Sequence, residues 1–478
     1  MRTRTLVLVG WFVVGLVVLS VVLLNRGKAA RAQAQRASDN RVVLANGITV
    51  LMYPIPGADR VALESFHRVG FLHEPRGMIQ AAHLLEHLVC QCATRSYEAG
   101  EAMRLLNQKG MANAETLADF THFDYVLPSE QLEVALQVVA ERLSSLRIVP
   151  EVIRQEAPKC HQEADFVERN PRAGMLKHAF MAFSHAWRHG ERKAQVHEGL
   201  EHIPVADLER FYRASCHPQR LVLVLIGGFE RAKALELVKQ HLGSIQPSDA
   251  ATPQPLPWSQ VPKEMTVQWD SSVRAVCIGF PPPDDVKERL LLTLWGNLLM
   301  QRLMTDTKVQ GAADAVFCTN QAWTVGTLPF FVYATAKTNV SVEQLHRLLA
   351  ARLQTIITRG PGEPEMTQLR FMAVRFAQEP VLTWDVIRQQ GEAAASELGR
   401  DPEEAAGLVM GNMAIQLGLR ELLLGSDSAR VAKTLQAVAA DDLHRLLRRT
   451  LDPSRGFVTV LMPMGQARQR TPEESDAP

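Results

Sequence analysis

The sequence has no excess of charge of either sign. Lysine and arginine number 52 and aspartate and glutamate 51, which gives a formal net charge of +1 over 478 residues. Such a chain has no overall field with which to hold a polyanion, so a nucleic-acid-binding function is disfavoured. Glycine (29 residues) and proline (26 residues) are near their average usage, which argues against a low-complexity chain.

Cysteine is also scarce. The chain has six, namely Cys90, Cys92, Cys160, Cys216, Cys277 and Cys318. Six cysteines in a chain of this length do not make a disulfide framework. Cys90 and Cys92 lack the spacing and the second pair of a zinc knuckle. We therefore predict ordinary buried thiols.

One uncharged apolar run, from Leu6 to Leu24, precedes the globular part of the chain. At 1.5 Å per residue a helix over this run would be about 28 Å long, close to the hydrocarbon thickness of a bilayer. We expect a single uncleaved transmembrane anchor, within an N-terminal segment of residues 1–40. A cleaved signal peptide is the alternative, because Ala30-Arg31-Ala32 is a weak cleavage site.

The flanks of this run give opposite indications of orientation. Positive residues are more numerous after the run than before it, which favours a cytoplasmic body. A short N-terminal leader ahead of a single span favours a body outside the cytoplasm. We expect an extracytoplasmic, periplasmic body, with the orientation left open.

From Arg41 onward the pattern becomes globular. Residues 41–52 read as two short strands around an Asn-Gly turn. Further strands are expected at 61–69, 111–116 and 121–127, and helices at 78–92 and 129–146. Hairpins alternating with helices indicate an α+β layered domain.

The chain also contains a repeat. Asp207, Leu208, Arg210, Arg213, Pro218 and Arg220 recur 235 positions later as Asp442, Leu443, Arg445, Arg448, Pro453 and Arg455, and each copy leads into a strand. The proline-rich stretch 245–263 between the copies reads as a linker. We predict two homologous domains at 41–247 and 265–464, joined by a linker at 248–264 and followed by a polar tail at 465–478.

The chemistry concentrates at His83-Leu84-Leu85-Glu86-His87. The two histidines are four apart, so on a helix their rings lie on one face and can hold one cation. Glu86 lies near enough to take a proton from water at the metal. Neutral imidazole suits Zn²⁺, and a catalytic zinc site has three protein ligands and one position for water. H-x-x-E-H is the inverted form of a zinc-protease motif.

A third ligand must come from elsewhere in the chain. Glu156 and Glu163 follow about 76 residues later and are seven apart, so both can face one way from a second helix. Pro158 is awkward within such a helix because it removes a backbone hydrogen bond.

With these motifs the chain resembles the pitrilysin, insulinase and mitochondrial processing peptidase family of zinc metalloendopeptidases. The resemblance implies that His83, His87 and Glu163 are the ligands of one Zn²⁺ per chain and that Glu86 is the catalytic base. Glu156 matches a supporting acidic residue of that family, and Asn113-Ala114-Glu115-Thr116 matches its N-A-x-T strand, which pairs with the substrate backbone at Asn113 and Ala114. The resemblance covers 41 to about 464 and implies two layered α/β-sandwich domains in a clam-shell arrangement.

One family element is altered here. The second domain of the family usually carries R-x-x-x-G-L-x-Y, whose Arg and Tyr hold the substrate. Lys308 and Asp314 fall at these positions, and neither replaces the chemistry of the expected residue. Some family members divide the work between two chains, so we expect a homologous subunit that supplies the missing Arg and Tyr, unless Lys308 or Arg302 compensates within the chain.

The remaining histidines have no partner at ligand spacing. His122, His161, His185, His189 and His202 are interpreted as structural or surface residues.

Three functions remain open. The first, which we favour, is a zinc-dependent endopeptidase acting on extended or unfolded peptides. The second is a proteolytically inactive family member serving as a binding or scaffold subunit of a hetero-oligomer. The third is a membrane-tethered structural protein in which H-x-x-E-H is accidental.

Overall fold

The computed structural model describes residues 40–169 and 199–463, apart from 252–253, 255–257, 262, 270–271, 320–328, 378–381 and 426–427. The predicted membrane span at residues 6–24 and the tail at 465–478 therefore lie outside the described residues. Within the described ranges, no helix combines the length and the hydropathy needed to cross a bilayer.

The first half of the chain builds a six-stranded sheet in the order β1-β2-β6-β3-β5-β4. Its strands are β1 (Arg41–Val43), β2 (Thr49–Pro54), β3 (Arg60–His67), β4 (Met111–Thr116), β5 (Thr121–Pro128) and β6 (Leu221–Gly227). Its helices are α3 (Ala81–Gln91), α4 (Glu101–Lys109), α5 (Leu132–Ser144), α6 (Pro150–Arg169), α9 (Val205–Ser215) and α10 (Arg231–Leu242). The predicted hairpins are confirmed: β1 pairs with β2 across the Asn-Gly turn, where Gly47 has φ +94°, and β4 pairs with β5.

The second half repeats this plan with a five-stranded sheet in the order β7-β11-β8-β10-β9. The strands are β7 (Glu264–Trp269), β8 (Ala275–Phe280), β9 (Ala313–Thr319), β10 (Phe330–Ala336) and β11 (Phe457–Pro463). The helices are α11 (Val286–Thr305), α12 (Thr307–Ala312), α13 (Val342–Arg359), α14 (Glu363–Ala377), α15 (Trp384–Leu398), α16 (Pro402–Leu424), α17 (Ser428–Gln436) and α18 (Ala440–Thr450).

Apart from β1, the strands of the first sheet correspond one by one to those of the second. In each, one parallel pair (β2 with β6, β7 with β11) is followed by three antiparallel pairings. The repeated sequence lies at equivalent places, since α9 leads through a 3₁₀ turn into β6 and α18 leads through another into β11. The repeat in the sequence thus corresponds to a repeat in topology.

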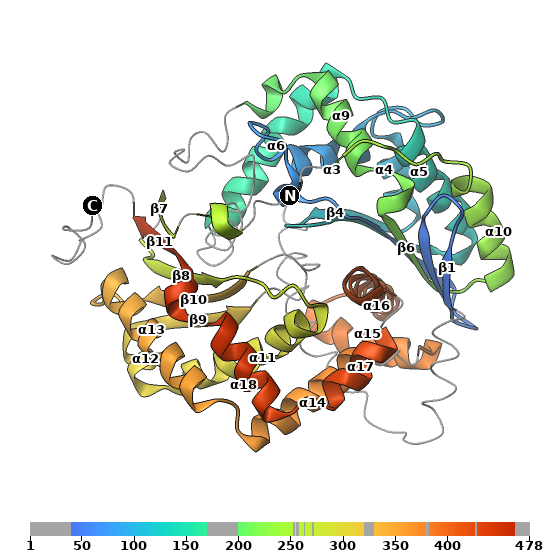
Figure 1. Ribbon diagram of the computed structural model, residues 1–478. Coiled ribbons are helices and arrows are strands. Elements are labelled where there is room, and N and C mark those ends of the chain that lie inside the picture. Colours follow the sequence, from blue (N-terminus) through green and yellow to red (C-terminus); the bar gives the residue numbers. More distant parts are fainter. Residues whose placement is uncertain are drawn as a thin grey trace.

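Each sheet buries one face under helices of its own half. Alternate strand residues such as Leu63, Phe123 and Tyr125 pack with α3, α5, α6 and α9 in the first core. The other face of the first sheet, including Phe66 and Val126, is covered by α16 from the second half of the chain. Figure 1 shows α16 lying against the strands of this sheet. The two halves are therefore joined through a shared apolar core.

Candidate metal centre

Helix α3 carries the two histidines of the H-x-x-E-H motif. The His83 and His87 ring centroids lie 4.9 Å apart with an interplanar angle of 86°. The first turn of α3 is fixed by Glu74, whose fully buried carboxylate accepts hydrogen bonds from the backbone N–H groups of Gln80 and Ala82, each at 3.0 Å. A carboxylate at a helix N-terminus is favoured because it accepts otherwise unpaired N–H groups. Sequence reasoning missed Glu74, because it lies outside the local capping positions.

Helix α6 carries the second set of candidate ligands. Glu156, Cys160 and Glu163 are spaced by four and three residues, so all three lie on one face of this helix. The helix continues through Pro158. Pro158 is exposed, and so is Arg154, whose carbonyl would have accepted the missing N–H. The hydrogen bond that Pro158 removes therefore lies on the solvent side of α6. The helix is not interrupted there, and it places Glu163 beside α3.

The predicted ligands meet across these two helices. Glu163 Oε2 lies 3.3 Å from His83 Nε2 and 3.5 Å from His87 Nε2. Two imidazole nitrogens and a carboxylate oxygen at these separations match the donor set of a catalytic zinc site, whose ligands lie about 2.0–2.2 Å from the metal. The residues present therefore fit zinc.

Glu156 contacts His87 rather than the space between the ligands. Its Oε2 lies 3.0 Å from His87 Nδ1, and its Oε1 accepts a hydrogen bond from Lys159 Nζ at 2.5 Å. With Nδ1 held in this way, the ring directs Nε2 towards Glu163. A carboxylate on the far nitrogen of a metal-binding histidine fixes its tautomer and orientation.

Burial and hydrogen bonding oppose each other in the electrostatics of this cluster. Hydrogen bonds from His83 and His87 hold the pKa of Glu163 well below its ordinary value. Burial alone would lower the pKa of His87, but hydrogen bonds to Cys160, Glu156 and Glu163 outweigh it and raise that pKa above its ordinary value. Without metal, the carboxylates therefore favour a proton on His87, and a metal ion would take the place of that proton.

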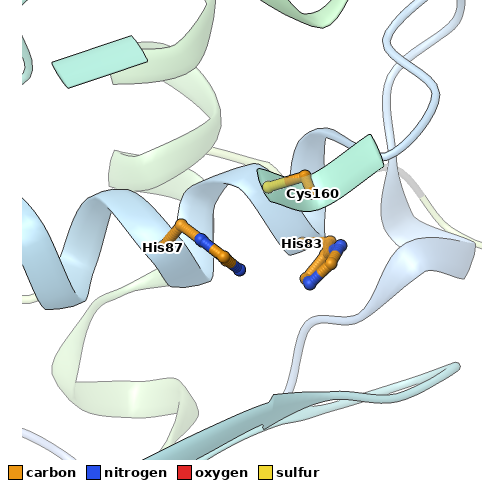
Figure 2. A group of neighbouring side chains, drawn as sticks. All are labelled: His83, His87 and Cys160. Carbon is orange, nitrogen blue, oxygen red and sulfur yellow. The ribbon is translucent and has the colours of Figure 1, made fainter. Parts of the chain in front are cut away.

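Cys160 lies beside the imidazoles as well (Figure 2). Its Sγ and the nearest ring nitrogens of His83 and His87 all lie within 4.8 Å of one another. The six thiols are free and buried, as predicted. Cys160 nevertheless differs from an ordinary buried thiol because it lies beside two imidazoles that can bind a metal. Its position three residues before Glu163, on the same face of α6, could have indicated this in the sequence.

Glu86 is buried, with 8% of its surface exposed. Together with His67, Thr121 and Ser215 it lines a cavity of about 10 Å³ beneath α3. A cavity of this size is near the minimum that can hold one water molecule. The predicted base thus lies on the same helix as the two imidazoles, and it is more deeply buried than His83 and Glu163.

The predicted substrate strand is β4, at the edge of the first sheet. Asn113 is exposed and Ala114 is half-buried. Thr116, at the end of the strand, has its Oγ1 at 3.5 Å from the carbonyl oxygen of Ala82 on α3. The strand therefore ends beside the helix that carries His83.

The residues at the positions of the family's Arg and Tyr lie on the surface of the second half. Lys308 on α12 and Asp314 on β9 are both exposed. Arg302 is engaged elsewhere: it forms an ion pair with Glu365, donates to the Gly360 carbonyl at 3.1 Å and lies 5.3 Å from the Trp295 ring centroid. The guanidinium of Arg302 is therefore engaged with residues of the second half of the chain.

One of the remaining histidines departs from its interpretation as an isolated structural residue. His122 is buried beside the carboxylates of Glu64 and Asp124. His161 is half-buried and lies 3.5 Å from Glu201, whereas the His202 side chain is 80% exposed, as expected of a surface position. His185 and His189 lie outside the described residues.

Comparison with known families decides the classification. The family model described as insulinase (peptidase family M16) matches residues 50–194, and the model of the peptidase M16 inactive domain matches residues 202–372. The chain belongs to the M16 peptidase family. The H-x-x-E-H motif and Glu163 fall in the first match, and Lys308 and Asp314 fall in the second.

Known M16 proteins resemble the chain over most of its length. The zinc protease PqqE of Helicobacter pylori is 23% identical over 368 residues, which are 73% of this chain and 82% of that protein. The crystal structure of a protease from Helicobacter pylori aligns with a TM-score of 0.66 at 20% identity, over 88% of this chain and 99% of that one. The first half of the periplasmic protease PqqL from Escherichia coli aligns with a TM-score of 0.57 at 16% identity, over 88% and 91%. The matches to several other curated relatives cover less than half of those relatives' length.

Proposed function

We propose that the chain is a zinc-dependent endopeptidase that cleaves extended or unfolded peptides. The observation that carries the proposal is the convergence of His83, His87 and Glu163, with Glu163 Oε2 at 3.3 and 3.5 Å from the two imidazoles. Three ligands from two helices leave a fourth position for water, as hydrolysis requires.

Each residue has a distinct task in this mechanism. When bound, the zinc ion acts as a Lewis acid and lowers the pKa of water. His83, His87 and Glu163 bind it, while Glu156 holds the His87 ring by its Nδ1. Glu86 accepts a proton from the attacking water and delivers it to the departing amine nitrogen.

The edge position of β4 supports an extended substrate. An edge strand presents unpaired backbone groups, and a peptide that adds to it gains hydrogen bonds without strong sequence selectivity. Folded proteins offer no free strand and should resist cleavage.

A digest of matched substrates tests this proposal. The purified full-length chain should cleave an unfolded protein and leave the same protein intact when it is folded. Glu86→Gln should keep its zinc and fold but lose turnover by at least ~10². Cleavage by this variant at the original rate would remove Glu86 from the mechanism, and equal cleavage of folded protein would discard strand addition.

A non-proteolytic subunit is the second candidate function, and Cys160 is the observation that favours it. If its thiolate bound zinc together with His83, His87 and Glu163, the metal would have four protein ligands, as structural zinc sites do. Cobalt substitution distinguishes the two candidates, because a thiolate ligand produces an intense near-ultraviolet charge-transfer band. A band that disappears in Cys160→Ser, in a chain without peptidase activity, would establish the scaffold function.

We further propose that an N-terminal anchor at residues 6–24 holds the catalytic body in the periplasm. Support comes from the length of the apolar run and from the periplasmic location stated for the Escherichia coli protein PqqL. Protease accessibility of the body in intact spheroplasts tests this; protection until the inner membrane is disrupted would place the body in the cytoplasm.

A further inference from the structure

A second group of candidate metal ligands lies within the first sheet. Glu64 on β3 stands directly across from Asp124 on β5, and His122 lies two residues before Asp124 on the same face. All three are buried, with exposures of 0%, 8% and 4% for Glu64, Asp124 and His122. This face is the one covered by α16, since His122 stacks on Phe66 with ring centroids 5.5 Å apart.

The charges in this cluster are not balanced. Glu64 Oε1 and Asp124 Oδ1 are buried and have no hydrogen-bond partner among the described residues. Glu115 and Glu86 place further negative charge near Asp124. One imidazole thus faces a set of carboxylates, and burying unpaired carboxylates is costly.

We propose that Glu64, His122 and Asp124 bind a divalent cation of the zinc or manganese class, separate from the zinc centre on α3. His122 Nδ1 lies 3.4 Å from Glu64 Oε2 and 3.9 Å from Asp124 Oδ1. Ligands that surround a tetrahedral zinc at its usual bond lengths lie about 3.4 Å from one another. The three atoms are therefore close to ligand spacing already.

The far nitrogen of His122 is also supported. Its Nε2 lies 3.5 Å from Glu115 Oε2 on β4. Metal-binding histidines commonly donate their second N–H to a carboxylate, which fixes the tautomer that leaves the other nitrogen free to bind. Glu115 thus has towards His122 the relation that Glu156 has towards His87. Two carboxylates and a dication would together be neutral, which removes the charge imbalance.

The cation would connect β3 to β5 and, through Glu115, to β4. Glu115 follows Asn113 and Ala114, so the ion would fix the strand to which a peptide is proposed to add; this consequence alone rests on the proposed function. The binding site itself depends only on Glu64, His122 and Asp124.

Metal counting tests the proposal independently of peptidase activity. The full-length chain, dialysed against Zn²⁺ or Mn²⁺, should retain two equivalents, and the double variant His83→Ala/His87→Ala should retain one. Adding Asp124→Asn to that double variant should remove the remaining equivalent. Glu115→Gln should weaken its binding by about 10- to 100-fold, whereas the exposed His202→Ala serves as the matched control and should change nothing.

The metal counts can also contradict the second site. A double variant that binds no metal and shows no shift in Tm on addition of either cation would overturn the proposal and leave the cluster as an ion pair. Retention of the metal after Asp124→Asn would place it elsewhere. If Asp124→Asn fails to fold, the count on the unsubstituted chain decides, since one equivalent contradicts the second site. If the site on α3 binds no zinc, the chain should still retain one equivalent of metal at Glu64, His122 and Asp124.

Discussion

At the scale of single residues, the metal centre depends on side chains that act in pairs. His83 contacts Glu163, and His87 contacts both Glu163 and Glu156. Removing His83 leaves two of the three proposed ligands. We expect His83→Ala to lose its zinc during dialysis while keeping its fold, as measured by metal analysis and circular dichroism. Full zinc stoichiometry in this variant would contradict the assignment.

Glu156 should act on zinc only through His87. Glu156→Gln removes the negative charge 3.0 Å from His87 Nδ1 but leaves all three proposed ligands in place. We expect the affinity for zinc to fall by about 10- to 100-fold, measured by competition with a chelator. Glu151→Gln is the matched control, because Glu151 is exposed on the same helix and pairs only with Arg154. Equal affinities in the two variants would show that Glu156 has no such role.

At the scale of elements, the packing of α16 on the first sheet depends on a glycine. A Cβ built on Gly418 would lie 2.0 Å from Cε2 of Phe66, which is fully buried and cannot move aside. We expect Gly418→Ala to lower the free energy of unfolding by about 1–3 kcal/mol through overpacking, measured by urea denaturation.

Gly311 on α12 provides the control for helix propensity. Nothing lies within 4 Å of a Cβ built there. Gly311→Ala should therefore raise the free energy of unfolding by up to about 1 kcal/mol. A gain in stability from both substitutions would show that the contact between α16 and β3 is loose.

At the scale of the whole molecule, stability should depend on pH through buried neutral histidines. Burial lowers the pKa of both His67 and His73 to about 4, and His73 Nδ1 accepts a hydrogen bond from the Gly70 N–H, which requires an unprotonated nitrogen. The unfolded chain takes up these protons near pH 6.5 and the folded chain only near pH 4. Their contribution to stability is therefore present above pH 6.5 and is lost as the pH falls towards 4.

A difference measurement isolates this effect from the carboxylates, because the raised pKa of Asp124 works in the opposite direction. In metal-free protein, His67→Gln should lose less stability than the unsubstituted chain between pH 7 and pH 4, by about 3 kcal/mol. Denaturant midpoints measured across this range provide the test. Parallel curves would mean that the pKa of His67 is the same in the folded and the unfolded chain.

The assembly of the active protein is a further whole-molecule question. Lys308 and Asp314 are exposed, and Arg302 is held by Glu365, so the described part of the second half supplies no Arg/Tyr pair. We expect the isolated chain to hold zinc but to cleave peptides feebly, with activity restored by a homologous subunit carrying that element. Size-exclusion chromatography with a peptide assay measures this. Full activity as a monomer would discard the partner.

The sequence alone determined the parts of this protein that depend on local geometry. Helical pitch places His83 and His87 on one face, and Glu156, Cys160 and Glu163 on another, whatever surrounds them. The same holds for the Asn-Gly turn between β1 and β2 and for the repeated junctions before β6 and β11. The metal motif and the duplicated plan could therefore be predicted.

Tertiary structure decided what depends on contacts between distant parts of the chain. Strand pairing placed Glu64 across from Asp124 and beside His122, whereas in the sequence His122 stands alone. Packing placed α16 from the second half on the first sheet, and engaged Arg302 with Glu365. Such contacts depend on the register and burial of whole elements at once. The spacing of residues along the sequence does not predict these contacts, because many arrangements of the same helices and strands satisfy the same sequence pattern.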